Sequence, residues 1–162
     1  MASSVKEIRW HEDLIQAGSE TYILRWYESH KYFSYMYRVK MDNGQYVNME
    51  IYAFNAGKKY RGWTVILSVP SKKKKGYEFR KQTGRNGITS LLIAKEIIKY
   101  HTENVIKKDK SRDHLFYIGW DDKAREKAYT RGLSDLGFVI HDNCFLEGVN
   151  YGRGLVKVIK NI

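Results

Sequence analysis

The chain has 162 residues, of which 43% are hydrophobic and 14% aromatic, so we expect a single domain with its own core over residues 1–162. The 29 Lys and Arg residues outnumber the 18 Asp and Glu residues, and the net charge of +11 favours polyanionic partners. No segment approaches the roughly 18 consecutive apolar residues of a membrane span, and the N-terminus lacks the apolar core of a signal peptide. These features exclude membrane and exported proteins, so we expect an intracellular, cytoplasmic protein.

Cysteine and histidine usage excludes several kinds of site. Cys144 is the only cysteine, so the chain has no internal disulfide, which fits a reducing compartment. It lacks the local signature of a catalytic thiol, and we expect it to lie in a strand. The five histidines show no i, i+4 pair around a glutamate, which excludes a zincin-type metal site. Small size, high aromatic content and the lone cysteine would suit a microbial or phage-encoded protein.

The first element predicted along the chain is a helix over Val5–Ala17. Ser4 and Glu7 have the spacing of a capping box, and Gly18 follows where a helix commonly ends. The face expected to pack on the core consists of Ile8, Leu14 and Ile15.

Three strands are predicted next. The aromatic-rich segment Thr21–His30 is interpreted as a strand, although its periodicity also allows a helix. Large side chains alternate with smaller or polar ones over Phe33–Met41, and Asp42-Asn43-Gly44 is the strongest short-range signal for a hairpin. The return strand is predicted over Tyr46–Phe54. One of its faces carries Val47, Met49 and Ile51.

A further turn at Ala56-Gly57-Lys58 leads to an apolar strand over Trp63–Val69, which Pro70 ends. Its β-branched content without strict alternation predicts a central strand that is covered on both faces. A basic loop at about 71–83 follows. It contains a run of four lysines, Lys72, Lys73, Lys74 and Lys75. A lid, a docking surface for nucleic acid or an acidic macromolecule, and a plain solvated loop are all open interpretations.

The most informative segment is a glycine-containing turn directly in front of a long amphipathic helix. The helix is predicted over Ile88–Tyr100, where apolar residues recur at helical spacing. Its first N–H groups have no partner inside the helix and lie at the positive end of the macrodipole, so they favour a phosphate or pyrophosphate. A loop that only starts a core helix is the alternative. The residues of the turn are Gly84, Arg85, Asn86, Gly87, Ile88 and Thr89.

The last part of the chain predicts a strand over Leu115–Trp120 and a helix that runs to about Asp135 and is closed by Gly137. Two strand-like segments follow, Phe138–Leu146 and Leu155–Ile159. The expected fold class is therefore α/β, with a mixed, mostly antiparallel central sheet and helices on both faces.

This order of elements, with the glycine turn before the longest helix, resembles the GCN5-related N-acetyltransferase (GNAT) superfamily, of which the chain would be a divergent member. The family's turn for acetyl-CoA carries Gln or Arg, two residues, Gly, one residue, and Gly or Ala. The register 84–89 matches at Gly87, whereas Gly84 and Thr89 depart from the first and last positions. The basic loop at 71–83 is an insertion relative to the family.

A second counterpart of the family is the unit from Phe116 to Phe138. Asp121 stands for the family's Asn, Ala124 for its Ala, and Gly137-Phe138 for the closing pair. Tyr129 lies near the position of the tyrosine that often protonates the thiolate of CoA in the family. A core-packing tyrosine is the alternative interpretation.

The resemblance implies transfer of an acetyl group from acetyl-CoA to an amine. The pyrophosphate would lie on the backbone of Arg85–Thr89, and the pantetheine arm would add to two splayed strands that end near Val69 and Trp120. Tyr129 would act as general acid. Glu50 is the main candidate for the base, with His30 and Glu28 as alternatives.

A different class of function is also open. The +11 charge, and aromatic residues interleaved with basic ones, fit a protein with an acetyltransferase-like fold but no catalysis. Such a protein would bind nucleic acid or act as a protein adaptor. The acyl acceptor and the oligomeric state do not follow from the sequence.

Overall fold

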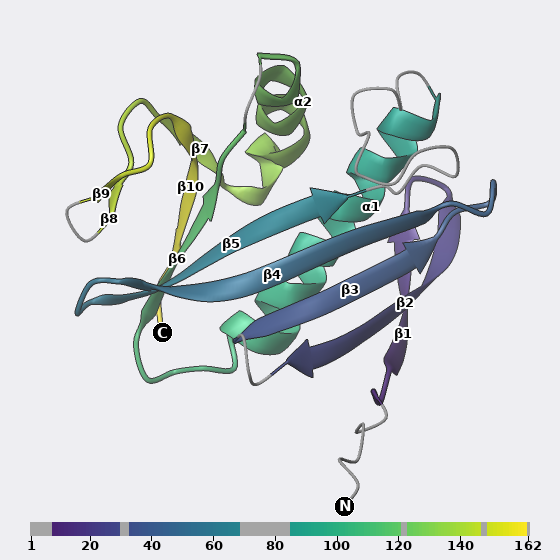
Figure 1. Ribbon diagram of the computed structural model, residues 1–162, viewed down its shortest axis with the longest axis horizontal. Coiled ribbons are helices and arrows are strands. Elements are labelled where there is room, and N and C mark those ends of the chain that lie inside the picture. Colours follow the sequence, from purple (N-terminus) through teal and green to yellow (C-terminus); the bar gives the residue numbers. More distant parts are fainter. Residues whose placement is uncertain (1–7, 30–32, 69–84, 121–122, 147–148, 162) are drawn as a thin grey trace, which may run out of the picture.

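The computed structural model describes residues 8–29, 33–68, 85–120, 123–146 and 149–161. These residues form one open sheet of eight strands with two α-helices, and a separate two-stranded hairpin (Figure 1). The sheet order is β1-β2-β3-β4-β5-β6-β10-β7. Its strands are β1 (His11–Ala17), β2 (Glu20–Ser29), β3 (Ser34–Lys40), β4 (Tyr46–Ala56), β5 (Tyr60–Ser68), β6 (Asp113–Ile118), β7 (Val139–His141) and β10 (Gly154–Ile159).

The remaining elements connect these strands. Helix α1 (Arg85–His101) continues into a π-helical turn (Thr102–Ile106), and α2 (Lys123–Leu133) continues into a 3-10 turn (Ser134–Leu136). The separate hairpin consists of β8 (Phe145–Leu146) and β9 (Val149–Asn150). The expected mixed, mostly antiparallel α/β sheet is confirmed, because β5 and β6 are the parallel pair in an otherwise antiparallel sheet.

Both described helices pack on the same face of the sheet, so the prediction of helices on both faces is wrong. The connections β5-α1-β6 and β6-α2-β7 advance in the same direction along the sheet, and right-handed crossovers of that kind place their helices on one face. Contacts between the two helices agree with this arrangement. We call this the helix face and the opposite one the helix-free face.

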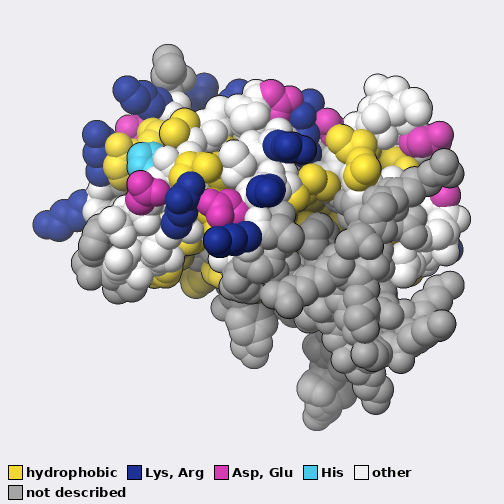
Figure 2. All heavy atoms as spheres, turned by 90° about the horizontal axis from the view of Figure 1, so that it is seen from above, with side chains coloured by type: hydrophobic (Ala, Val, Ile, Leu, Met, Phe, Trp, Pro, Cys, Tyr) yellow, Lys and Arg dark blue, Asp and Glu magenta, His cyan; other side chains and the backbone are white. Residues whose placement is uncertain are grey.

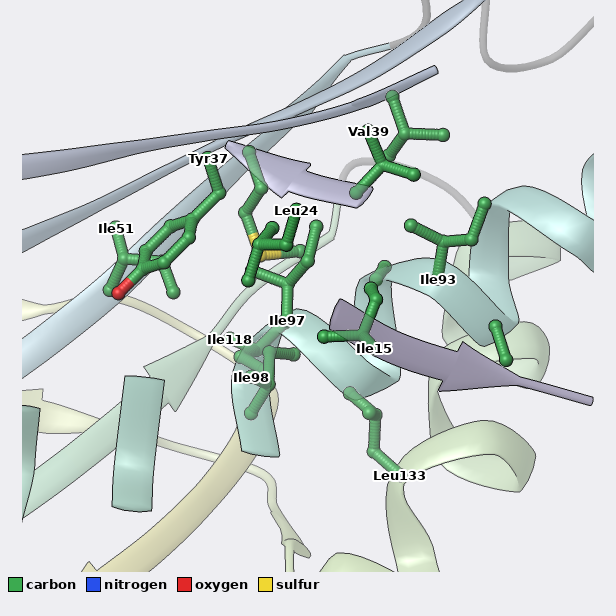
Figure 3. Close-up of a cluster of buried hydrophobic side chains, with 14 of the residues drawn as sticks. Ile15, Leu24, Tyr37, Val39, Ile51, Ile93, Ile97, Ile98, Ile118 and Leu133 are labelled. Atoms are coloured by element: carbon green, nitrogen blue, oxygen red, sulfur yellow. The ribbon is translucent and has the colours of Figure 1, made fainter. Parts of the chain in front are cut away.

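The core lies between α1 and the helix face. Figure 3 shows Leu24, Tyr37, Val39 and Ile51 from the strands pointing toward the apolar side of α1. The α1 residues that complete this core are Ile93, Ala94, Ile97 and Ile98, all buried. Their spacing is the one that predicted the helix, which the structure extends to Arg85–His101.

The predicted helix at Val5–Ala17 is wrong over its described part, where His11–Ala17 forms the edge strand β1. Strand periodicity decides the outcome: Ile15 and Ala17 are buried against the helix face, while Leu14 is 65% exposed. Gly18 is not a helix cap. It has a φ of 65° in the two-residue turn that joins β1 to β2.

Most of the other strand predictions hold with changed boundaries. The hairpin around Asp42-Asn43-Gly44 forms as expected, and Val47, Met49 and Ile51 are buried on one face. The strand predicted at Trp63–Val69 is β5, but it is not covered on both faces, since Ile66 is 51% exposed on the helix-free face. The segment Phe138–Leu146 does not form one strand. Cys144 lies between β7 and β8, where it is buried.

Candidate functional site

The strands β5 and β6 separate toward their carboxyl ends. Their parallel pairing runs only from Tyr60–Asp113 to Trp63–Phe116, although β5 continues to Ser68 and β6 to Ile118. Figure 1 shows the two strands leaving a common point and diverging toward their arrowheads. We call the space between 64–68 of β5 and 117–118 of β6 the gap. On the gap side, the edge of β5 has no strand partner among the described residues.

The floor of the gap is apolar and belongs to the helix face. It holds a cavity of about 20 Å³, enough for one water molecule. A cavity of this size is not a chamber for a ligand larger than water. Its lining comes from both helices and three strands: Met49, Val65, Leu67, Leu91, Ala94, Ile98, Ile118, Tyr129 and Leu133.

Helix α1 begins on the side to which the gap opens, because a crossover helix starts beyond the carboxyl end of the preceding strand. Its first turn, Arg85 to Gly87, contains no acidic residue that would neutralise the free N–H groups. Ile88 is 64% exposed and Thr89 is half-buried. Two other predicted cofactor residues, Val69 and Gly84, lie outside the described residues, as does the loop 71–83.

Tyr129 is the predicted catalytic residue that the structure brings to the gap. It lies on α2 one turn before Leu133, and both side chains line the floor together with Ile118 of β6. The tyrosine is partly buried against the main core.

Glu50 lies on the opposite side of the sheet. It is partly buried on the helix-free face of β4, with Met36 and Ile66 as its cross-strand neighbours. Burial and the nearby Glu50 carboxylate raise the pKa of Tyr52, two residues along the same strand. The structure therefore does not place Glu50 and Tyr129 side by side. The sheet separates them, and β5 lies between Glu50 and the gap.

Of the two alternative bases, the structure describes Glu28 but not His30. Glu28 is exposed on β2 and accepts a hydrogen bond of 3.2 Å from the Tyr35 hydroxyl. That contact contributes to raising the pKa of Tyr35 to about 12, although burial is the larger cause. His30 lies outside the described residues.

The positive charge is not gathered in one place on the side of the molecule that Figure 2 shows, where Lys and Arg side chains alternate with acidic and hydrophobic ones. Among the described residues, no group of three or more His, Cys, Asp or Glu side chains has a geometry that could hold a metal ion. No helix in this part of the chain is long and apolar enough to cross a membrane.

The sequence analysis did not identify the apolar residues that line the floor of the gap. Val65, Leu67 and Leu91 look like ordinary core residues in the sequence, and only the divergence of two strands leaves a cavity beside them. Comparison of the chain with models of protein families, with curated proteins and with solved structures finds no match.

Proposed function

We propose that the protein is an acyltransferase similar to the GCN5-related N-acetyltransferases, which binds acetyl-CoA at the gap between β5 and β6 and transfers the acetyl group to an amine. One observation carries the proposal. The parallel pair of an otherwise antiparallel sheet separates at its carboxyl ends, next to the start of α1. Ligands of α/β sheets commonly bind at such a place.

The gap offers complementary partners for the parts of acetyl-CoA. The pantetheine arm carries amide groups, which can pair with the free edge of β5 at 64–68 as a short added strand would. The apolar floor suits its methylene groups. The pyrophosphate would lie on the N–H groups of the first turn of α1, where no acidic residue competes.

Tyr129 is the proposed general acid. A phenol with an ordinary pKa of about 10 stays protonated at neutral pH, and a thiolate leaving group can take its proton. The amine nitrogen forms a bond to the thioester carbonyl carbon, and the bond from that carbon to sulfur breaks. The proposal is supported by the position of Tyr129, whose side chain lines the floor of the gap.

Glu50 is the proposed base, acting from the other side of the sheet. An amine that approaches from the helix-free face would pass Glu50 before it reaches the gap, with one strand between them. The carboxylate can take the amine proton directly or through water. The acid and the base then act on opposite sides of the reacting carbon, which fits two substrates that meet across the sheet.

Thermal unfolding with and without acetyl-CoA tests the proposal. Acetyl-CoA at about 100 times its dissociation constant is expected to stabilise the protein by roughly 2.7 kcal/mol, which raises the melting temperature by about 5–10 °C at this chain length. Gly87→Glu is expected to abolish the shift, because it places a carboxylate where the pyrophosphate would bind. A glutamate in the first turn favours a helix, so this variant should still fold.

Asn55→Asp is the matched control. It adds the same charge at an exposed position of β4 near the amino end of β5, away from the gap. Wild type and control should respond alike to acetyl-CoA. Absence of any shift in a folded wild type would contradict acetyl-CoA binding and favour a module without catalysis that keeps this fold.

A further inference from the structure

The helix-free face of the first four strands carries a row of polar side chains that the proposed reaction does not use. Successive cross-strand partners on β1, β2, β3 and β4 make up the row, so their side chains lie side by side on one face. We call it the arginine row. Its members are Glu12, Arg25, Arg38 and Asn48.

Two cations stand directly opposite each other at the centre of this row. Arg25 pairs with Arg38 in the register of β2 and β3, and like charges in that position destabilise a sheet. Each guanidinium is held through its Nε, Arg25 by Glu12 at 2.9 Å and Arg38 by Asn48 at 2.8 Å. Among the described residues, the terminal nitrogens of both side chains have no hydrogen bond. These nitrogens can therefore donate several hydrogen bonds to one anion.

Aromatic rings flank the pair. The Arg38 guanidinium carbon lies 5.4 Å from the ring centre of Trp10 and 5.2 Å from that of Tyr46. Trp10 also packs edge-on against Tyr27, at 4.8 Å between ring centres. Tyr46 is 40% exposed, and Lys40 lies beside it at 6.0 Å. Aromatic rings and positively charged side chains thus alternate on the helix-free face.

We propose that this face binds single-stranded nucleic acid, with a phosphate group on Arg25 and Arg38 and unpaired bases stacked on the neighbouring rings. An arginine pair offers the planar donor groups that phosphate oxygens accept. Exposed aromatic rings on a sheet bind bases that are free to unstack, which favours a single strand over a duplex. Glu12 and Glu50 on the same face reduce its charge locally, but the net charge of +11 still attracts a polyanion.

The test is the fluorescence anisotropy of a labelled 12-nucleotide oligothymidylate, measured at several salt concentrations. The double variant R25Q/R38Q is expected to bind at least tenfold more weakly than the wild type. The slope of log affinity against log salt should fall by about 0.7, because the arginine pair contacts one phosphate and each phosphate contact to a single strand contributes about 0.7. Y46A should lose at least about fivefold in affinity with an unchanged salt slope, since it removes stacking and no charge.

The matched control is K108Q/R131Q, which removes two exposed cations outside this face. It should bind like the wild type. Equal losses in the two double variants would overturn the proposal, because general charge would then account for binding. A folded wild type that does not bind at 50 mM salt would overturn it too, as would sedimentation showing that the face joins two copies of the chain. None of these measurements uses acetyl-CoA. A failure of nucleic-acid binding can therefore be distinguished from a failure of the proposed acetyl transfer.

Discussion

The Tyr37 hydroxyl lies 2.6 Å from Nδ1 of His101, and both side chains are fully buried in the core. Burial raises the pKa of Tyr37, so the phenol keeps its proton and forms a hydrogen bond with Nδ1 of His101. The other ring nitrogen of His101 is Nε2. Among the described residues, that nitrogen has no hydrogen-bond partner. Burial is also the main cause that lowers the pKa of His101 to about 3.

We expect His101 to make the protein less stable as the pH falls from 6.5 toward 3. The unfolded chain binds a proton on this histidine below its ordinary pKa of 6.5, whereas the folded chain binds it only near 3. The stabilisation is therefore complete above pH 6.5 and is lost on acidification, by up to about 1.4 kcal/mol per pH unit. Urea unfolding at pH 7, 6 and 5 measures the slope.

The variant His101→Gln should be less stable than the wild type at pH 7 and should show a flatter dependence between pH 6.5 and 5. His141→Gln is the control, because His141 is exposed. The same slope in the wild type and in His101→Gln would show that other groups cause the acid sensitivity.

The second prediction tests β1. Ile15→Ala should cost about 2–5 kcal/mol of unfolding free energy, because Ile15 is only 7% exposed in the core. Leu14→Ala should change the stability by less than about 0.5 kcal/mol, because the Leu14 side chain points to the helix-free face and is 65% exposed. Chemical denaturation of both variants measures the difference. Equal losses would instead favour the helix that the sequence predicted, with Leu14 and Ile15 both facing the core.

The third prediction compares two glycines. A Cβ at Gly154 would overlap the Tyr117 ring and lie 3.0 Å from the Ile118 carbonyl oxygen, so Gly154→Ala should destabilise by about 1–3 kcal/mol. Gly132 lies inside α2, and a Cβ there would meet Leu91 at an ordinary 3.4 Å. Gly132→Ala should therefore stabilise by about 0.5–1 kcal/mol. Melting temperatures that move in the same direction for both variants would contradict the packing described for one of them.

The fourth prediction concerns the proposed general acid. Tyr129→Phe keeps the ring that packs beside Leu133 but removes the hydroxyl. The turnover number should fall about 10²- to 10⁴-fold, while the thermal shift with acetyl-CoA stays as in the wild type. Release of free CoA thiol with a panel of primary amines measures the rate. A variant with unchanged turnover would assign Tyr129 to packing alone.

The residues at the gap show which parts of the candidate site can be predicted from the sequence and which require the structure. Tyr129 was named as a site residue because it lies near the tyrosine position of the family that the chain resembles, and its side chain lines the cavity beside the gap. Glu50 was named only as an acid on a central strand. Alternation along the strand puts it on the face opposite to Met49 and Ile51, but no local pattern indicates which residues of other strands lie beside it. That depends on the register of β4 against β3 and β5, which long-range pairing sets.

The arginine row could not be found from sequence for the same reason. Arg25 and Arg38 are thirteen positions apart, and they become neighbours only through the register of β2 with β3. Alternation within each strand indicates that both residues share a face with polar neighbours, but it does not indicate which residues stand opposite each other.

The sequence by itself determined the elements whose signals are local. The 3.6-residue period of Ile93, Ala94, Ile97 and Ile98 defines α1, and Asp42-Asn43-Gly44 defines the hairpin, because both signals act between residues close in the chain. Only the tertiary structure decided the secondary structure of His11–Ala17. The capping pattern favours a helix there, but pairing with β2 buries Ile15 and Ala17 in a strand. It also decided which face of the sheet the helices cover and where β5 and β6 separate. These features depend on contacts between distant residues, whose energy outweighs local preference.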